Sequence, residues 1–354
     1  MSQVAPAPPA TLVRPRGVPA LWAGAAVAFL AVAVVIGILA GPVDIGLLDI
    51  LHSAAARLGL GTSPLDSIDE SILWQIRVPR VVLAGLVGAT LALSGATYQG
   101  VFRNALADPY LLGVAAGAGL GATLAIAYLP QALRGHEILP PAAFVGGVAA
   151  VGLTYAVSRS AGRQRDAATL VLGGVTVASF FTAVQAFVQQ QNTDTLQQVY
   201  SWILGGLPST GWTDVVLVLP YIVAAAVVIL AHRRVLDVLS VGDAEAASLG
   251  VDVKRVRIVL VIAATVGTAA AVSVSGLIGF VGIIVPHAIR LTVGTSFRGL
   301  LPLSAIVGAG FLVLADVVAR TALAPAELPI GVVTAFVGAP FFALVLRTSR
   351  GGGG

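Results

Sequence analysis

The sequence has 354 residues, of which 57% are apolar and only 10% are charged. Soluble domains carry roughly 25% charged residues, so this chain has too few charges to cover a surface facing water. Its mean hydropathy of +0.97 indicates a protein embedded in membrane lipid. The net charge of +4 is small and scattered and gives no indication of a nucleic-acid partner. There is no cysteine, which excludes disulfides and thiolate metal sites.

In chain order, residues 1–19 are rich in Pro and Ala and predict a disordered tail. Ten uncharged stretches follow as candidate spanning helices, which need about 20 apolar residues each. The long stretch that ends at Pro286 is divided near Ser273–Gly276, where Ser and Gly favour a turn, and its second half is short. Residues 348–354 are expected to form a second disordered tail. The ten stretches lie near residues 20–40, 81–102, 111–130, 138–158, 167–191, 215–231, 258–275, 276–289, 301–319 and 328–346.

The charges between these stretches predict an orientation. With the N-terminus inside and the spans alternating, most of the 20 Lys and Arg residues fall on the inner side. Cytoplasmic loops carry such an excess, so both termini are expected in the cytoplasm. Arg77, Arg80 and Arg320 then lie on the outer side, where cations are few.

The loop of residues 232–257 is the longest on the inner side and predicts short helices. Asp243 could cap a helix over the run AEAASLG, and Gly250 would end it. Such a loop could be a docking surface for a cytosolic partner or an ordinary solvated connection, and composition alone leaves both interpretations open.

Several patterns bear on chemistry. The only lysine is Lys254, and no glycine-rich loop ends in Gly-Lys-Ser/Thr, so any ATP must be bound by another chain. The run AAGAGLGA follows no strand and is interpreted as helix packing. The four histidines are far apart, which argues against a metal site, and the chain has no credible catalytic cluster for a membrane-embedded enzyme.

Near the C-terminus, Asp316 and Arg320 are four residues apart on one helical face. They could form an internal ion pair, with Glu327 as another partner, or Arg320 could face an external anion. An acidic residue within a span would also suit an ion-gradient-driven secondary transporter, although Asp316 lies close to an edge. Four glutamines near the outer end of the fifth stretch could line a transport pathway or lie at the membrane interface. They are Gln185, Gln189, Gln190 and Gln191.

Six sequence blocks occur in a characteristic order between about residues 70 and 347. They are WQIRVPR, GATYQGVFRNALADPYLLGVAAGAGLGA, SWILGGL, GDAEAASLGV, SGLIGFVGIIVPHAIR and LLPLSAIVGAGFLVLADVVARTALAPAELPIGVVTAFVGAPFF. This pattern resembles the iron-chelate and cobalamin uptake permeases of ATP-binding-cassette (ABC) importers. The resemblance implies an all-α integral membrane protein of the type II ABC importer permease fold, with ten transmembrane helices per subunit in one domain, residues 20–347.

The resemblance also implies a function and a set of partners. The chain would be the permease subunit that moves a bulky metal chelate inward across the bacterial inner membrane, the chelate being a ferric siderophore, haem or cobalamin. It would pair with a second permease subunit, expected to be an identical copy, and with two cytosolic ATPase subunits that bind ATP and Mg. An external or lipoprotein binding protein would deliver the ligand. The chain itself would be no enzyme, would hold no cofactor or metal, and would contact membrane lipid.

Site residues follow from the same resemblance. Arg77 and Arg320 match arginines that dock the binding protein. An arginine suits this role, because it can hold a partner carboxylate through two hydrogen bonds. Arg80 is interpreted as a membrane-interface anchor. The ATPase-coupling segment would cover about residues 236–252, with Gly242, Asp243, Glu245, Ala246, Leu249 and Gly250 as its matching residues. The cytoplasmic gate would comprise Asn104, Leu106, Ala167 and Ala168. The positions of Ala167 and Ala168 carry side chains with a hydroxyl group in the cobalamin permease, and here they are alanines preceded by Asp166.

Overall fold

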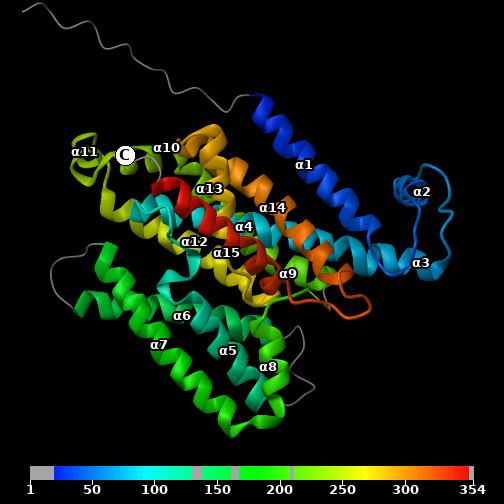
Figure 1. Ribbon diagram of the computed structural model, residues 1–354, viewed down its shortest axis with the longest axis horizontal. Coiled ribbons are helices and arrows are strands. Elements are labelled where there is room, and N and C mark those ends of the chain that lie inside the picture. The colour runs from blue at the N-terminus through cyan, green and yellow to red at the C-terminus, as the bar shows by residue number, and fades with distance from the viewer. Residues whose placement is uncertain (1–19, 130–137, 161–166, 208–210, 351–354) are drawn as a thin grey trace, which may run out of the picture.

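The computed structural model describes residues 20–129, 138–160, 167–207 and 211–350, and in these ranges the regular structure is helical (Figure 1). The first half contains α1 (Ala20–Leu39), α2 (Leu47–Arg57), α3 (Ser67–Ser71), η1 (Ile72–Arg77), α4 (Val78–Phe102), η2 (Pro109–Leu112), α5 (Val114–Tyr128) and α6 (Leu139–Ser160). The second half contains α7 (Ala167–Gln191), η4 (Thr193–Thr195), α8 (Leu196–Ile203), α9 (Trp212–Ala231), α10 (Arg233–Val241), α11 (Asp243–Ser248), α12 (Val253–Ser275), α13 (Val281–Val293), α14 (Phe297–Thr321) and α15 (Ile330–Arg350).

Seven helical segments in the described part of the chain are long and apolar enough to cross a membrane. They are α1, the continuous segment Ser67–Phe102, α6, α7 from Ala168, α9, α12 and α14. Three shorter apolar helices, α5, α13 and α15, occupy the remaining predicted stretches. A multi-span membrane protein is therefore confirmed, whereas the number ten is not.

The predicted division of the long apolar run is also confirmed. Helix α12 ends at Ser275, and Gly276 has a φ of 64°, in the region that favours glycine. A Cβ at Gly276 would collide with the backbone oxygen of Trp202, so close packing requires glycine there as well. Helix α13 begins only at Val281 and is 13 residues long. At the C-terminus, α15 extends through Arg350, past the predicted end of the last span near residue 346. The tails 1–19 and 351–354 lie outside the described residues.

Helix α4 forms the centre of the bundle and is buried over most of its length (Figure 1). Small residues allow its neighbours to approach closely: a Cβ at Gly88 would collide with the backbone of Gly308 on α14, and one at Gly95 with Gly282 on α13. Helices in lipid associate largely through such packing of small residues. Glycines of α4 thus allow this helix to pack closely against α13 and α14, two later segments of the chain.

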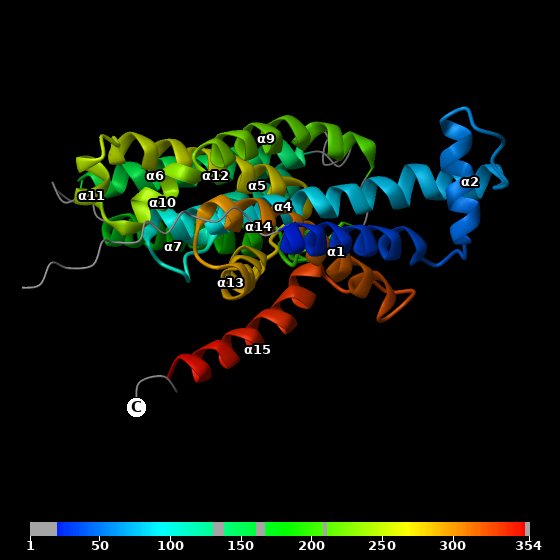
Figure 2. The same cartoon turned by 90° about the horizontal axis from the view of Figure 1, so that it is seen from above.

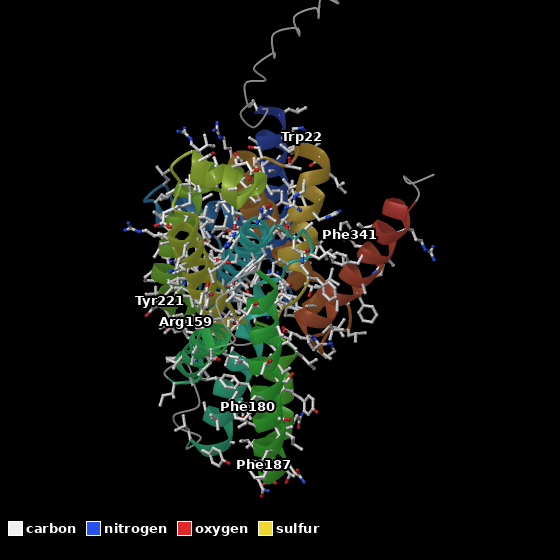
Figure 3. The ribbon with its side chains drawn as sticks, turned by 90° about the vertical axis from the view of Figure 1, so that its left-hand side faces the viewer. Trp22, Arg159, Phe180, Phe187, Tyr221 and Phe341 are labelled. Carbon is white, nitrogen blue, oxygen red and sulfur yellow. The ribbon has the colours of Figure 1, made fainter. Side chains whose placement is uncertain are left out.

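Apolar side chains also cover the outside of the bundle. Phe180 and Phe187 on α7 are 64% and 61% exposed (Figure 3). Helix α15 diverges from the other helices, and α2 lies across the end of α4 (Figure 2). The exposed apolar surface of a chain with so few charges suits contact with lipid or a further subunit.

Candidate functional site

Five residues that the sequence singled out gather where α1 ends, and we call them the arginine cluster: Arg77, Arg80, Asp316, Arg320 and Glu327. They come from η1, α4, α14 and the segment before α15. The cluster lies at the end of the bundle that carries α2 and α3, opposite the end that carries α10 and α11 (Figure 1).

Arg77 caps the C-terminus of α1. Its Nη1 donates to the carbonyls of Ile38 and Leu39, each at 3.3 Å, and its Nη2 donates to the carbonyl of Val43. The last carbonyls of a helix lack partners within it and carry partial negative charge, so a guanidinium stabilises them. Gly41 leaves room for the side chain, because a Cβ there would lie 2.6 Å from Nη2. Only 3% of Arg77 is exposed, so its hydrogen bonds are directed into this chain.

Arg320 contacts the same helix end. Its Nη1 donates to the carbonyl of Ala40 at 2.9 Å and its Nη2 to that of Gly37 at 2.6 Å. Its Nε lies 3.3 Å from Oδ2 of Asp316, so the internal ion pair, one of the two interpretations of their spacing of four residues, is present. Arg77 and Arg320 thus hold the end of α1 from two different helices.

Arg80 makes the most extensive ion pair of the cluster. Its Nε and Nη2 donate to Asp316 at distances of 2.9–3.2 Å, and its Nη1 and Nη2 donate to the two carboxylate oxygens of Glu327, each at 2.9 Å. Arg80 is 7% exposed and Asp316 is fully buried. The interpretation of Arg80 as an interface anchor is therefore wrong, because its guanidinium is turned into the protein and fully paired.

At the opposite end of the bundle, the helix predicted in the loop of residues 232–257 is present, but Asp243 is its first residue and not the cap that precedes it. Gly242, not Asp243, precedes α11, and Gly250 ends it with a φ of 81°. Ala246 is completely buried, whereas Leu249 is 71% exposed. The segment of residues 236–252 therefore packs through one face and presents another to the surroundings.

The carboxylate of Asp243 pairs with two arginines from other parts of the chain. Arg103 Nη2 lies 2.9 Å from Oδ1, and Arg257 Nη2 lies 3.0 Å and 3.2 Å from Oδ1 and Oδ2. Nothing in the sequence near Asp243 identifies these partners, since they are 140 residues before it and 14 after it.

Asn104 and Leu106, the predicted gate residues, lie in a surface loop directly after α4. Both are exposed, Leu106 to 54%. Ala168 is exposed in the first turn of α7. Ala167 begins that helix, but its side chain and Asp166 lie outside the described residues. Asn104 thus lies in the loop after α4 and Ala168 lies at the start of α7, so the two predicted parts of the gate come from separate segments of the chain.

Asp108 closes this loop. Its carboxylate accepts a hydrogen bond from the backbone N–H of Tyr110 at 2.7 Å and so caps η2. Burial raises the pKa of Asp108 to about 6, and the hydrogen bond from Tyr110 opposes that change only in part.

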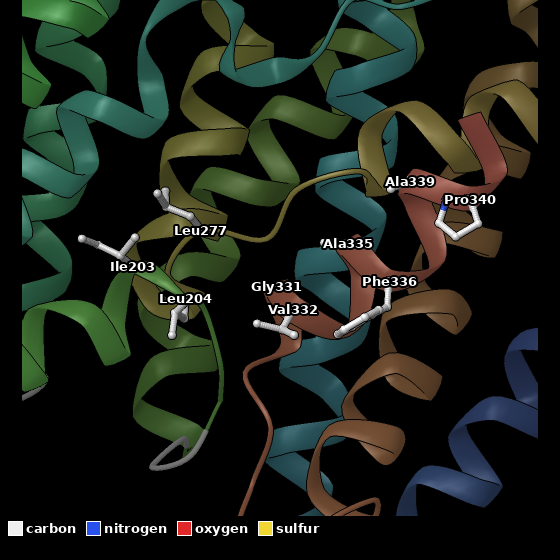
Figure 4. A pocket seen from close by; sticks show the side chains of 9 residues that line it. All are labelled: Ile203, Leu204, Leu277, Gly331, Val332, Ala335, Phe336, Ala339 and Pro340. Atoms are coloured by element: carbon white, nitrogen blue, oxygen red, sulfur yellow. The ribbon is translucent and has the colours of Figure 1, made fainter. Parts of the chain in front are cut away.

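An apolar groove of about 590 Å³ lies between the end of α8 and the diverging α15 (Figure 4). Ile203, Leu204 and Leu277 lie on one side of the groove, and Val332 and Phe336 lie on the other. Among the described residues, no three His, Asp or Glu side chains are placed to hold a metal ion. The groove can accept apolar surface, but its walls offer few polar groups.

The fold and these sites define a multi-span helical membrane protein with charge clusters at both ends. Residues 29–348 match the FecCD transport family, and the chain belongs to that family. Similar relatives include the cobalamin import system permease protein BtuC of Halobacterium salinarum, 45% identical over 278 residues, which are 78% of this chain and 74% of that protein. The hemin transport system permease protein HmuU of Yersinia pestis is 39% identical over 283 residues, 78% of this chain and 83% of that protein.

A solved structure is also similar over nearly its whole length. It is described as an inward-facing conformation of a metal-chelate type ABC transporter. The match has a TM-score of 0.81 and 29% sequence identity, and it covers 93% of this chain and 99% of that chain. The resemblance drawn from the six sequence blocks is confirmed.

Proposed function

We propose that this protein is the permease subunit of an ABC importer that moves a bulky metal chelate into the cell. The observation that carries the proposal is the similarity in fold, over 93% of this chain, to a metal-chelate type ABC transporter. The chelate would be a ferric siderophore, haem or cobalamin, and relatives named for cobalamin and hemin support this range.

In this proposal α5, α13 and α15 cross the membrane together with the seven longer helices, which gives the ten spans of a type II permease. A second copy of the chain packs beside the first, and the exposed side of α15 is the candidate contact, because Phe336 there is 78% exposed. The groove between α8 and α15 would then border the pathway. Mostly apolar walls suit a pathway that must release its cargo.

Two ATPase subunits on the cytosolic side would bind ATP and Mg and supply the energy. Segment 236–252 is the proposed contact with them, and exposed Leu249 and Glu245 support this assignment. Both chain termini would lie in the cytoplasm, which follows from the excess of Lys and Arg on that side. The membrane would be the inner membrane of a bacterial cell.

On the outer side, a binding protein would deliver the chelate near the arginine cluster. Arg77 and Arg320 remain the proposed docking residues, and both now donate to carbonyls at the end of α1. To hold a carboxylate of the binding protein, they would exchange these carbonyls for it. Asn104, Leu106, Ala167 and Ala168 remain the proposed cytoplasmic gate.

The alternative, a secondary transporter driven by an ion gradient, has less support. Such a protein would need a membrane acid that can exchange an ion. Asp316 is the nearest candidate, and its carboxylate is held by Arg80 and Arg320.

Reconstitution in liposomes tests the proposal. Uptake of radiolabelled cobalamin, haem or a ferric siderophore should require the cytosolic ATPase with ATP and Mg and the external binding protein. Binding of each chelate by the purified binding protein would identify the cargo. Uptake by this chain alone under a proton gradient would contradict the proposal.

A further inference from the structure

Asp243 joins three segments that are separate in the sequence. It is the first residue of α11, and its carboxylate contacts Arg103 at the end of α4 and Arg257 in the first turns of α12. Arg103 and Asp243 are 43% and 45% exposed at their side chains, whereas Arg257 is 19% exposed. Exposed ion pairs add little to stability, so the pair between Arg103 and Asp243 contributes little to folding.

Arg103 also ends α4 in an unusual conformation. Its φ of 50° and ψ of 38° lie in the left-handed region, which side chains other than glycine rarely adopt. Asn104 N–H then bonds back to the carbonyl of Gln99 at 3.1 Å, which closes the last turn of α4. This conformation turns the chain away from the helix at the residue whose side chain contacts Asp243.

The loop that follows, residues 103–108, is held by its own hydrogen bonds. The side chain of Asn104 accepts from the N–H of Leu106 at 2.9 Å, and its carbonyl accepts from that of Ala107 at 3.0 Å. Asp108 closes the loop by capping η2. Asn and Asp side chains stabilise turns in this way. These hydrogen bonds tie Asn104, which directly follows Arg103, to Leu106 and Ala107.

The neighbouring helix α10 contacts the same end of the bundle. Leu236 and Phe297 both pack at Gly100, in the last turn of α4. Asp237 accepts hydrogen bonds from the N–H of Phe297 at 2.6 Å and the hydroxyl of Ser296 at 3.0 Å. Segment 236–252 thus holds the ends of both α4 and α14, and the pair between Arg103 and Asp243 connects it to the loop.

We propose that Arg103 is a positioning residue that, through Asp243, makes loop 103–108 move together with segment 236–252. The inference rests on the proposed function, in which that segment contacts the ATPase and that loop carries half of the cytoplasmic gate. Movement of the ATPase would then reach the gate by a direct contact at the surface as well as through the membrane helices.

Transport by the reconstituted complex tests this coupling. Arg103→Gln should keep ATP hydrolysis but lower the amount of chelate transported per ATP by about five-fold or more. The double variant Arg103→Gln/Asp243→Asn should be no worse than Asp243→Asn alone, because the two residues act through one contact. Arg298→Gln is the matched control: it removes the arginine that lies 3.5 Å from Asp237 on the same side of the molecule, and it should behave as wild type.

Three results would overturn the proposal: a wild-type transport ratio in Arg103→Gln, additive losses in the double variant, or an equal loss in Arg298→Gln. If the wild-type complex assembles and binds ATP but shows no ATP-dependent uptake, the proposed function fails instead, and a distance measurement still tests the contact.

That measurement uses the natural absence of cysteine. Ala105→Cys and Ala247→Cys place spin labels at two exposed positions, one in the loop and one in α11. In the otherwise wild-type complex, the distance between the labels should be the same with and without ATP. In Arg103→Gln, the distance distribution should shift or broaden on ATP binding. A shift of equal size in both proteins would show that the loop moves independently of Arg103.

Discussion

Arg80 and Asp316 lie 236 residues apart in the sequence and form a buried ion pair with three N–H···O contacts of 2.9–3.2 Å. The pair joins the start of α4 to the end of α14, the two helices whose backbones also meet at Gly88 and Gly308. Arg80 further holds Glu327, after α14 has ended. One guanidinium therefore fixes the position of the connection that leads into α15.

Replacement of Arg80 should destabilise the protein strongly. Arg80→Met leaves Asp316 with Arg320 alone, and removal of one partner from a buried pair costs about 3–5 kcal/mol. Thermal unfolding in detergent measures the change. Glu70→Gln removes an exposed pair of 3.8 Å with Arg57 and should cost less than about 1 kcal/mol. Similar losses of stability in the two variants would contradict the assignment of Arg80 to a structural ion pair.

Reversal of charge at the proposed docking residues should weaken capture of the binding protein. Arg77→Glu and Arg320→Glu should each raise the concentration of binding protein that half-stimulates ATP hydrolysis by about ten-fold, since loss of a charge-assisted contact of 1.4 kcal/mol has that effect. Assembly with the ATPase should persist.

The control for this experiment is Arg57→Glu, which reverses an exposed charge in α2. Because Arg77 and Arg320 also support the end of α1, the melting temperature of each variant must be measured in parallel. An unchanged dependence on binding-protein concentration would remove both residues from docking and leave them with the structural role alone.

Because α4 and α14 approach closely at Gly88, replacement of Gly88 and of Gly152 by alanine should change stability in opposite directions. Gly88→Ala would force a Cβ into the backbone of Gly308, and such overpacking typically costs about 1–3 kcal/mol. Gly152→Ala in α6 meets nothing within 4 Å and should stabilise by up to about 1 kcal/mol, because alanine favours the helix. Unfolding temperatures of the two variants in detergent test the difference. A well-tolerated Gly88→Ala would contradict the packing.

Asp108 should make stability depend on pH. Its pKa is raised from 3.8 to about 6, so the folded protein retains a proton that the unfolded chain has already lost between these values. Stability therefore falls as the pH rises from about 4 to about 6 and is level above that range. Asp108→Asn keeps an acceptor for Tyr110, should remove this fall, and should unfold at a higher temperature than wild type at pH 7.5. Equal pH profiles for wild type and Asp108→Asn would refute the assignment.

Orientation can be tested with single cysteines, because the natural chain has none. Thr62→Cys should react with a membrane-impermeant maleimide in intact cells, whereas Ala247→Cys should react only after lysis. Both positions are exposed, so access to the reagent depends on the side of the membrane. The opposite labelling pattern would invert the proposed topology.

Much of the helical framework could be predicted from local sequence. Apolar runs without charge are stable in lipid only as helices, because every backbone polar group must find a partner within the segment. Gly276 marked the break between α12 and α13 for the same local reason, its freedom to adopt a positive φ. Helix ends were less predictable: the segment containing α4 begins at Ser67, well before the uncharged run, because charged residues are tolerated beyond the membrane boundary.

The sequence by itself determined that this chain is a multi-span helical membrane protein, and its ordered motifs determined the family. Only the tertiary structure decided which charges meet. The spacing of Asp316 and Arg320 within one helix offered their contact as one of two interpretations, whereas the contacts of Arg80 with Asp316 and of Arg103 with Asp243 depend on how distant helices pack. A buried charge is stable only beside a partner, and helix packing brings that partner from anywhere in the chain.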